Sequence, residues 1–108
     1  MNLKKATLLI LAMISVCAAT TPLNAQPAPS WLRYPAISPD GQTIVFAYKG
    51  DIYRVPASGG AAIPLTAHDA HDSYPVWSHD SRTIAFASDR FGNFDVFLMP
   101  AGGGEARR

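Results

Sequence analysis

Tyr34-Pro35-Ala36-Ile37-Ser38-Pro39-Asp40-Gly41 and its near copy Tyr74-Pro75-Val76-Trp77-Ser78-His79-Asp80-Ser81 lie 40 residues apart and decide the fold of this sequence. The same offset of 40 carries Thr43-Ile44-Val45-Phe46-Ala47 onto Thr83-Ile84-Ala85-Phe86-Ala87. Self-similarity at a period of roughly 20 to 50 residues indicates a repeat architecture, in which each copy buries a face against its neighbour.

A third pair of similar segments, 51–60 and 95–104, is related by an offset of 44 residues. The second copy therefore carries a turn four residues longer, around Asp89-Arg90-Phe91-Gly92-Asn93. Length variation that falls in a turn while the flanking segments stay aligned is expected of a structural repeat.

Each copy has the pattern of several short strands separated by turn residues. In the first copy we expect strands at 35–38, 43–48, 51–55 and 62–65, with Lys49-Gly50 as a tight hairpin turn. Four short antiparallel strands per 40 residues are typical of a β-propeller blade. The sequence thus predicts an all-β fold with two four-stranded antiparallel blades, at 34–73 and 74–108.

The N-terminus has the features of an export signal. Two lysines within the first five residues precede an apolar run at 6–19, which is short for a membrane span of about 20 residues. We predict a signal peptide at 1–25 cleaved after Ala25, with Ala18 or Ala19 as alternatives, followed by a linker and entry segment at 26–33. The protein is then periplasmic or secreted. The single cysteine, Cys17, lies within this leader and follows Val16, which argues against lipid attachment.

Charge excludes some partners. Without residues 1–25 the chain keeps 7 basic and 8 acidic side chains, a formal charge of −1. There is no basic surplus to attract nucleic acid or, after signal cleavage, an anionic membrane. With no cysteine left, no disulfide stabilises the exported chain.

The number of repeats also limits how much of a propeller ring this sequence can form. Two blades bury one shared face, whereas about four to eight blades close a propeller ring. The sequence ends at Arg108, which aligns with Pro64 of the first copy, so we expect blade 2 to be truncated and the ring incomplete. The remaining blades are expected partners of this segment.

The turn at 38–41, the Gly59-Gly60 turn before Leu65-Thr66, and the segment 77–80 resemble the TolB-like propeller repeat, which is also WD40-like. His79 and Ser81 depart from the proline and glycine usual there.

The segments 31–41, 48–53 and 87–97 together resemble the N-terminal propeller of tricorn-type serine peptidases. That resemblance implies an exported hydrolase whose propeller gates or docks peptide or protein substrate. It implies catalytic domains several hundred residues downstream, so no catalytic residue and no cofactor is assigned to this chain. The alternatives are a TolB-like periplasmic interaction propeller, or the propeller of a prolyl-oligopeptidase-like enzyme or of an amidohydrolase.

Few residues are candidates for chemistry. The cluster His68-Asp69-Ala70-His71-Asp72 holds potential metal ligands, but a zinc site needs three or four converging groups, so we assign no metal and expect a polar connection between blades. Ser38 and Ser78 stand in turn motifs and lack a nucleophile elbow. We expect Asp40 and Asp80 to accept hydrogen bonds from turn amides.

The remaining candidates are expected to be structural. Asp89 and Arg90 are assigned to stabilising the longer turn, with a mutual salt bridge or a substrate contact as alternatives. The run 102–104 is no phosphate loop, because neither a lysine nor a helix follows it. The two tryptophans and five phenylalanines are expected in the core between blades, since aromatic residues at strand spacing usually pack inside; they are Trp31, Phe46, Trp77, Phe86, Phe91, Phe94 and Phe97.

Overall fold

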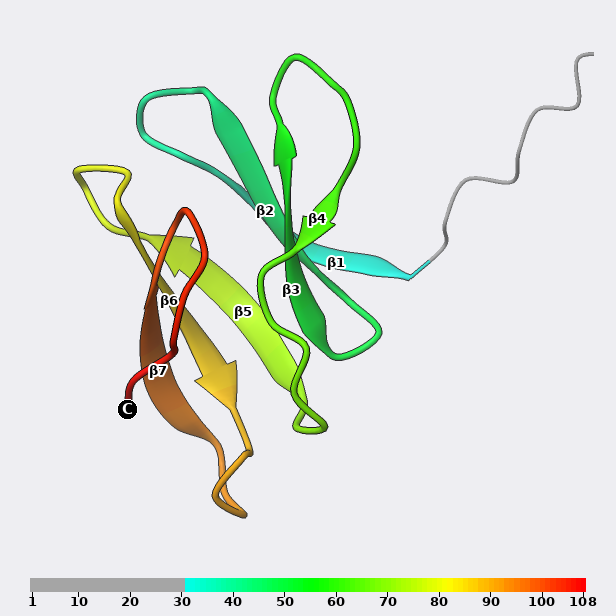
Figure 1. The fold of residues 1–108 in the computed structure, drawn as a ribbon, viewed down its shortest axis with the longest axis vertical. Helices are drawn as coiled ribbons and strands as arrows, with labels where there is room; N and C mark the ends of the chain where they lie inside the picture. Colours follow the sequence, from blue (N-terminus) through cyan, green and yellow to red (C-terminus); the bar gives the residue numbers. More distant parts are fainter. Residues whose placement is uncertain (1–30) are drawn as a thin grey trace, which may run out of the picture.

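The computed structural model describes residues 31–108, which form seven strands in two antiparallel sheets and no helix (Figure 1). The strands of the first sheet, in spatial order, are β1 (Leu32–Ile37), β2 (Thr43–Tyr48), β3 (Asp51–Pro56) and β4 (Ile63–Pro64). Those of the second are β5 (Asp72–Trp77), β6 (Thr83–Ser88) and β7 (Asp95–Pro100). The all-β prediction is confirmed.

The predictions for the signal peptide and for most of the segment 26–33 fall on residues 1–30, which lie outside the described residues. Within 31–108, no helix is long and apolar enough to cross a membrane.

The second sheet does not have the four strands that the repeat predicts. Its fourth position is occupied by a single bridge, in which Leu98 and Arg107 exchange backbone hydrogen bonds of 2.7 and 2.8 Å. In the first sheet, the equivalent position is filled by two residue pairs, Arg54 with Ile63 and Tyr53 with Pro64. Because only one pair forms here, the segment is a bridge and not a strand.

The two sheets are close copies in register as well as in sequence. Each first strand pairs with the second through a bulge, between Arg33 and Ala36 in one sheet and between Ser73 and Val76 in the other. Tyr34 and Tyr74 sit in these bulges with φ of 54° and 53°, a left-handed conformation that is uncommon for tyrosine. The bulges turn both tyrosines to the same side of the molecule.

The two sheets pack face to face, and they lie closer together along one edge than along the other. β5 is the strand of the second sheet that lies near β1, β2 and β3 of the first (Figure 1). The two sheets therefore converge along their first strands and diverge toward β4 and β7. A pair of sheets that converge along one edge forms a wedge, as blades around an axis do.

The core between the sheets joins two chemically different surfaces. The first sheet contributes small and branched aliphatic residues, and the second contributes large ones; the buried members are Val45, Ala47, Ile52, Ile84, Phe86, Phe97 and Met99. Burying each large side chain is worth about 1.5–3 kcal/mol. Two hydrogen bonds also cross the interface, from Trp77 Nε1 to the Ala36 carbonyl and from Arg54 Nη1 to the Ala101 carbonyl.

The expectation that the two tryptophans and five phenylalanines all lie in this core was wrong for four of them. Phe46 is buried, but it lies on the outer face of the first sheet, opposite the core residues Val45 and Ala47. Trp31, Phe91 and Phe94 are 61%, 65% and 59% exposed. Trp31 precedes β1, and the two phenylalanines belong to the longer connection between β6 and β7. They lie outside the strand segments that face the neighbouring sheet, so the strand-spacing argument does not apply to them.

The turn after each first strand keeps one geometry despite its substitutions. Ser81 takes a φ of 62°, close to the 72° of Gly41 at the equivalent position. The serine hydroxyl also accepts a hydrogen bond of 3.2 Å from the Asp40 amide, which links the two turns. The departure from glycine therefore leaves the turn intact.

We predict that Gly41→Ala lowers the free energy of unfolding by about 1 kcal/mol, because a left-handed φ is strained for alanine and is not strained for glycine. No atom lies within 4 Å of the added Cβ, so the effect is one of backbone conformation. Gly102→Ala is the matched control, since its Cβ also enters open space and its φ is ordinary. Urea unfolding curves of the two variants measure the difference, and equal midpoints would contradict the prediction.

Candidate functional site

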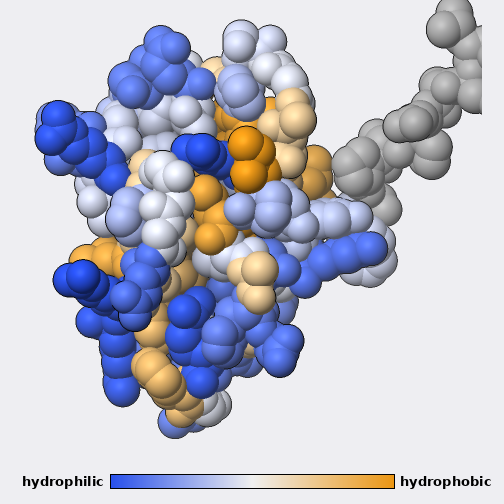
Figure 2. Space-filling view, in the orientation of Figure 1, coloured by the Kyte–Doolittle hydropathy of each residue, from blue (hydrophilic) through white to orange (hydrophobic). Residues whose placement is uncertain are grey.

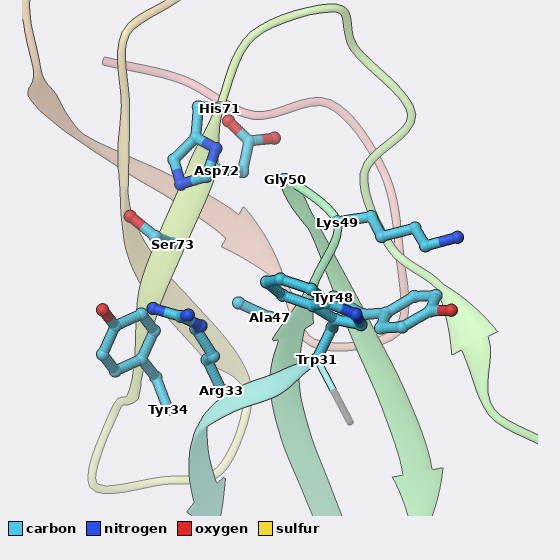
Figure 3. A pocket seen from close by; sticks show the side chains of 10 residues that line it. All are labelled: Trp31, Arg33, Tyr34, Ala47, Tyr48, Lys49, Gly50, His71, Asp72 and Ser73. Carbon is cyan, nitrogen blue, oxygen red and sulfur yellow. The ribbon is translucent and has the colours of Figure 1, made fainter. Parts of the chain in front are cut away.

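A cleft opens where the two sheets converge, with a volume of about 250 Å³ (Figure 3). It is formed by the start of β1, the β2–β3 hairpin and the start of β5. Its lining residues are Trp31, Arg33, Tyr34, Ala47, Tyr48, Lys49, Gly50, His71, Asp72 and Ser73. Aromatic rings and cationic side chains dominate this list, so the cleft suits a ligand with both apolar groups and hydrogen-bond acceptors.

Tyr34, which lines the cleft, pairs with Tyr74 of the second sheet. Their ring centroids are 4.0 Å apart, and the two hydroxyl groups share a hydrogen bond of 3.1 Å, in which the Tyr74 hydroxyl is the donor when Tyr34 ionises. This hydrogen bond lowers the pKa of Tyr34 and raises the pKa of Tyr74, and Arg33 lowers the pKa of Tyr34 further. Both rings remain exposed, at 37% and 57%, so the pair presents aromatic surface and hydroxyl groups to solvent.

Two cations of the cleft are exposed. Arg33 reaches toward Tyr34 (Figure 3), and Lys49 Nζ lies 5.3 Å from the centroid of the Tyr48 ring. Lys49 and Gly50 have φ of 49° and 86°, which forms the expected hairpin turn and leaves the lysine side chain pointing outward. The arrangement provides hydrogen-bond donors and positive charge around aromatic walls.

A buried ion pair supports the floor of the cleft. The Asp72 side chain is fully buried, and both of its oxygens accept hydrogen bonds from Arg90 Nη2, at 3.2 and 3.3 Å. The Arg90 guanidinium also donates to Ser88 Oγ and lies 4.6 Å from the Phe97 ring centroid. This ion pair neutralises the charge of the Asp72 carboxylate at the floor of the cleft.

The contacts of Asp89 and Arg90 contradict the alternative of a mutual salt bridge and agree with a role in stabilising the longer turn. The two do not pair with each other among the ion pairs of residues 31–108. Instead Asp89 accepts the backbone amide of His71 at 2.7 Å, while Arg90 holds Asp72. Both contacts secure the connection that leads into β5.

Burial raises the pKa of Asp51 at the start of β3, and the neighbouring charge of Asp72 raises it as well. A hydrogen bond of 3.4 Å from the Thr66 hydroxyl acts in the opposite direction. The Asp51 and Asp72 carboxylates therefore repel each other, and Arg90 is the cation that compensates Asp72.

The segment 68–72 has the local contacts of a polar connection. His68 Nδ1 accepts the amide of Ala70 at 3.0 Å, and His71 packs edge-on against Phe94. Across residues 31–108, no three His, Cys, Asp or Glu side chains are grouped so that they could hold a metal ion.

Ser38 and Ser78 stabilise the turns in which they stand through side-chain hydrogen bonds. Each hydroxyl donates to the aspartate two residues on, Asp40 or Asp80, and accepts the amide five residues on. The aspartates also accept the amides of residues 42 and 82, as expected. The serine hydroxyl and then the turn amide lower the pKa of each aspartate. This contribution to stability is present above the ordinary pKa of 3.8 and is lost as the pH falls through the lowered value.

The tyrosine pair was not predicted from the sequence, although Tyr34 and Tyr74 are the first residues of the repeated segments 34–41 and 74–81. The available signal was the same aromatic residue at the same repeat position, followed each time by proline. Inner strands of neighbouring blades bring equal repeat positions together, so the identity of these residues implied a contact.

The wedge of two sheets, the repeated bulge and the cleft at the converging edge define two neighbouring blades of a β-propeller. The comparison with protein families is specific: residues 29–108 match the tricorn protease N-terminal beta propeller domain, so the chain belongs to that family.

Relatives agree with this assignment. Tricorn protease homolog 1 of Streptomyces coelicolor is 34% identical over 81 residues, which cover 75% of this chain and 7% of that protein. The uncharacterised peptidase YuxL of Bacillus subtilis is 32% identical over 85 residues, covering 68% of this chain and 13% of YuxL. The chain thus spans a small part of the curated relatives it matches.

Solved structures show the same fold. A protein assigned as TolB from Agrobacterium tumefaciens superposes with a TM-score of 0.65 and 25% identity, over 74% of this chain and 30% of that one. TolB from Acinetobacter baumannii gives a TM-score of 0.55 and 25% identity, over 70% of this chain and 20% of that one.

We predict that Arg90→Ala lowers the free energy of unfolding by about 3 kcal/mol, because it leaves the buried carboxylate of Asp72 without its partner. Arg108→Ala is the control, since Arg108 pairs with Asp95 at the surface, where its side chain is 62% exposed. That variant is expected to change stability by less than about 1 kcal/mol. Chemical denaturation compares the two, and similar losses would show that Arg90 does not hold a buried charge.

Proposed function

We propose that this chain is exported and contributes a non-catalytic propeller segment to a tricorn-like serine protease, in which the cleft beside Tyr34 and Tyr74 docks peptide substrate. The observation that carries the proposal is the family match over 29–108, together with the position of the cleft on the converging edge of the blades. The similarity to tricorn protease homolog 1 and to the peptidase YuxL supports a peptidase context.

The chemistry of the cleft suits an extended peptide. Trp31 and the exposed tyrosine pair offer flat apolar surface to side chains, as aromatic residues commonly do in binding sites. Arg33 and Lys49 supply donors for the carbonyl or carboxylate oxygens of the peptide. Asp72 lines the same cleft but is already neutralised by Arg90, so it does not repel an acidic group.

A second candidate function is a TolB-like propeller that mediates contacts between folded proteins. The superposition on two TolB structures favours it. The two candidates differ in what the cleft recognises. A docking site for unfolded chain binds short peptides, whereas a protein-interaction propeller binds a folded partner over a larger surface.

We predict that Tyr74→Ala weakens binding of a short peptide mixture about 5-fold, which corresponds to about 1 kcal/mol for the lost aromatic contact. The binding is measured by the change in tryptophan fluorescence, to which Trp31 in the cleft contributes alongside Trp77. The protein is taken from the extracytoplasmic fraction, where a processed chain starting at Gln26 is expected.

Ile63→Ala is the control for this assay, because Ile63 is an exposed apolar residue on β4, away from the cleft. It should leave peptide affinity unchanged. Equal affinities of wild type and Tyr74→Ala would remove the cleft from the proposal. Absence of any peptide binding, with retention of a folded protein partner, would favour the second candidate.

A further inference from the structure

The Tyr34–Tyr74 pair places two phenol groups of different sheets in direct contact. The ring centroids lie 4.0 Å apart with the ring planes inclined at 31°, and the two hydroxyl oxygens are 3.1 Å apart. The ring carbons next to the hydroxyl groups, at which phenols couple on oxidation, therefore lie beside this contact. Each tyrosine stands in a bulge of its strand, so the backbone fixes the position of the pair.

The other two tyrosines are arranged differently. The sequence holds four, and all lie within the described residues. Tyr48 and Tyr53 have ring centroids 5.8 Å apart and ring planes at 79°, which is an edge-to-face contact. Both are half-buried, whereas Tyr34 and Tyr74 are 37% and 57% exposed. Close contact of nearly parallel rings and access to solvent are thus combined in the Tyr34–Tyr74 pair.

The pair lies on an edge that further blades would leave open. In a longer propeller, neighbouring blades pack on the outer sheet faces, where Val96 and Leu98 are exposed. Figure 2 shows apolar patches that reach the surface between polar regions over the sheets. Tyr34 and Tyr74 stand instead on β1 and β5, along which the sheets converge. Small molecules in the central channel of a propeller can therefore reach the two hydroxyl groups.

We propose that Tyr34 and Tyr74 are a modification site, at which a small one-electron oxidant forms a dityrosine cross-link between the two blades. Two equivalents of the oxidant remove one electron from each phenol, and each phenol releases its hydroxyl proton to water. The two phenoxyl radicals form one carbon–carbon bond between ring carbons next to the hydroxyl groups. The hydrogen on each of these carbons then moves to the oxygen through water, which restores both aromatic rings. The product lacks two hydrogen atoms relative to the starting chain.

Contact and charge favour the reaction at this pair. Because the rings are held side by side, the coupling step is intramolecular and is faster than coupling between separate chains. The hydrogen bond with Tyr74 and the charge of Arg33 lower the pKa of Tyr34, so this hydroxyl releases its proton more readily. The single cysteine, Cys17, lies within the predicted signal peptide, so no thiol of the exported chain competes for the oxidant. The inference goes beyond peptide docking and does not depend on it.

The test illuminates the full-length expressed protein with tris(bipyridine)ruthenium(II) and persulfate, a small one-electron oxidant, at a low protein concentration. We expect dityrosine fluorescence in the monomer fraction. We also expect a tryptic product in which peptide 34–49 is joined to peptide 55–82 with the loss of two hydrogen atoms. The urea midpoint of unfolding should rise, because a cross-link between residues 40 positions apart restricts the unfolded chain.

Three variants assign the product to the pair. Tyr34→Phe and Tyr74→Phe each keep the aromatic ring and remove the hydroxyl, and either should abolish the product. Tyr53→Phe is the matched control, since it also removes one phenol, and it should give the same yield as the wild type. Circular dichroism of all three should match the wild type.

A wild type that yields only cross-links between chains, or none, overturns the proposal. Persistence of the product in Tyr34→Phe or Tyr74→Phe overturns it as well, as does its loss in Tyr53→Phe. The wild type is also oxidised after unfolding in urea, where the product should be lost. An equal yield from the unfolded chain would show that the contact in the folded structure does not direct the coupling.

Discussion

The packing of a small aliphatic sheet face against an aromatic one is the interaction on which the rest of this structure depends. Val45 and Ile52 on one side and Phe86 and Phe97 on the other exclude water from the space between the sheets. A sheet with both faces in water has little to stabilise it, and each sheet here obtains its buried face from the other. The repeat in the sequence is the reason that the two faces match.

The functional features follow from that packing. Because the sheets converge along β1 and β5, the equivalent bulges bring Tyr34 and Tyr74 into contact at one edge. The same convergence encloses Asp72 and requires a cation beside it, which Arg90 provides from the longer turn. The four residues inserted in the second copy thus include the group that makes a buried carboxylate tolerable at the floor of the cleft.

The sequence predicted what depends on local pattern and on the repeat. The span of β2 was predicted in full, as were the Lys49-Gly50 hairpin and the role of Asp40 and Asp80 in their turns. Features that depend on how the two sheets lie against each other could not be predicted from the periodicity of the sequence.

Three features show that limit. Phenylalanine is a residue type common in protein cores, but Phe91 and Phe94 belong to the longer turn, which lies outside the area covered by the facing sheet, and both are exposed. The pairing of Asp72 with Arg90 spans 18 residues and needs the two sheets to be in place. The three-stranded second sheet reflects a single backbone pair at Arg107, which no pattern distinguishes from two.

Hydrogen exchange of the two tryptophan indole N–H groups tests the packing of the sheets most directly. Trp77 Nε1 donates to the Ala36 carbonyl across the interface at 3.0 Å, whereas Trp31 is 61% exposed. The account predicts that the Trp77 indole proton exchanges with solvent far more slowly than that of Trp31 in an NMR spectrum of the chain. Equal exchange rates for the two protons would show that the sheets are not packed together as described.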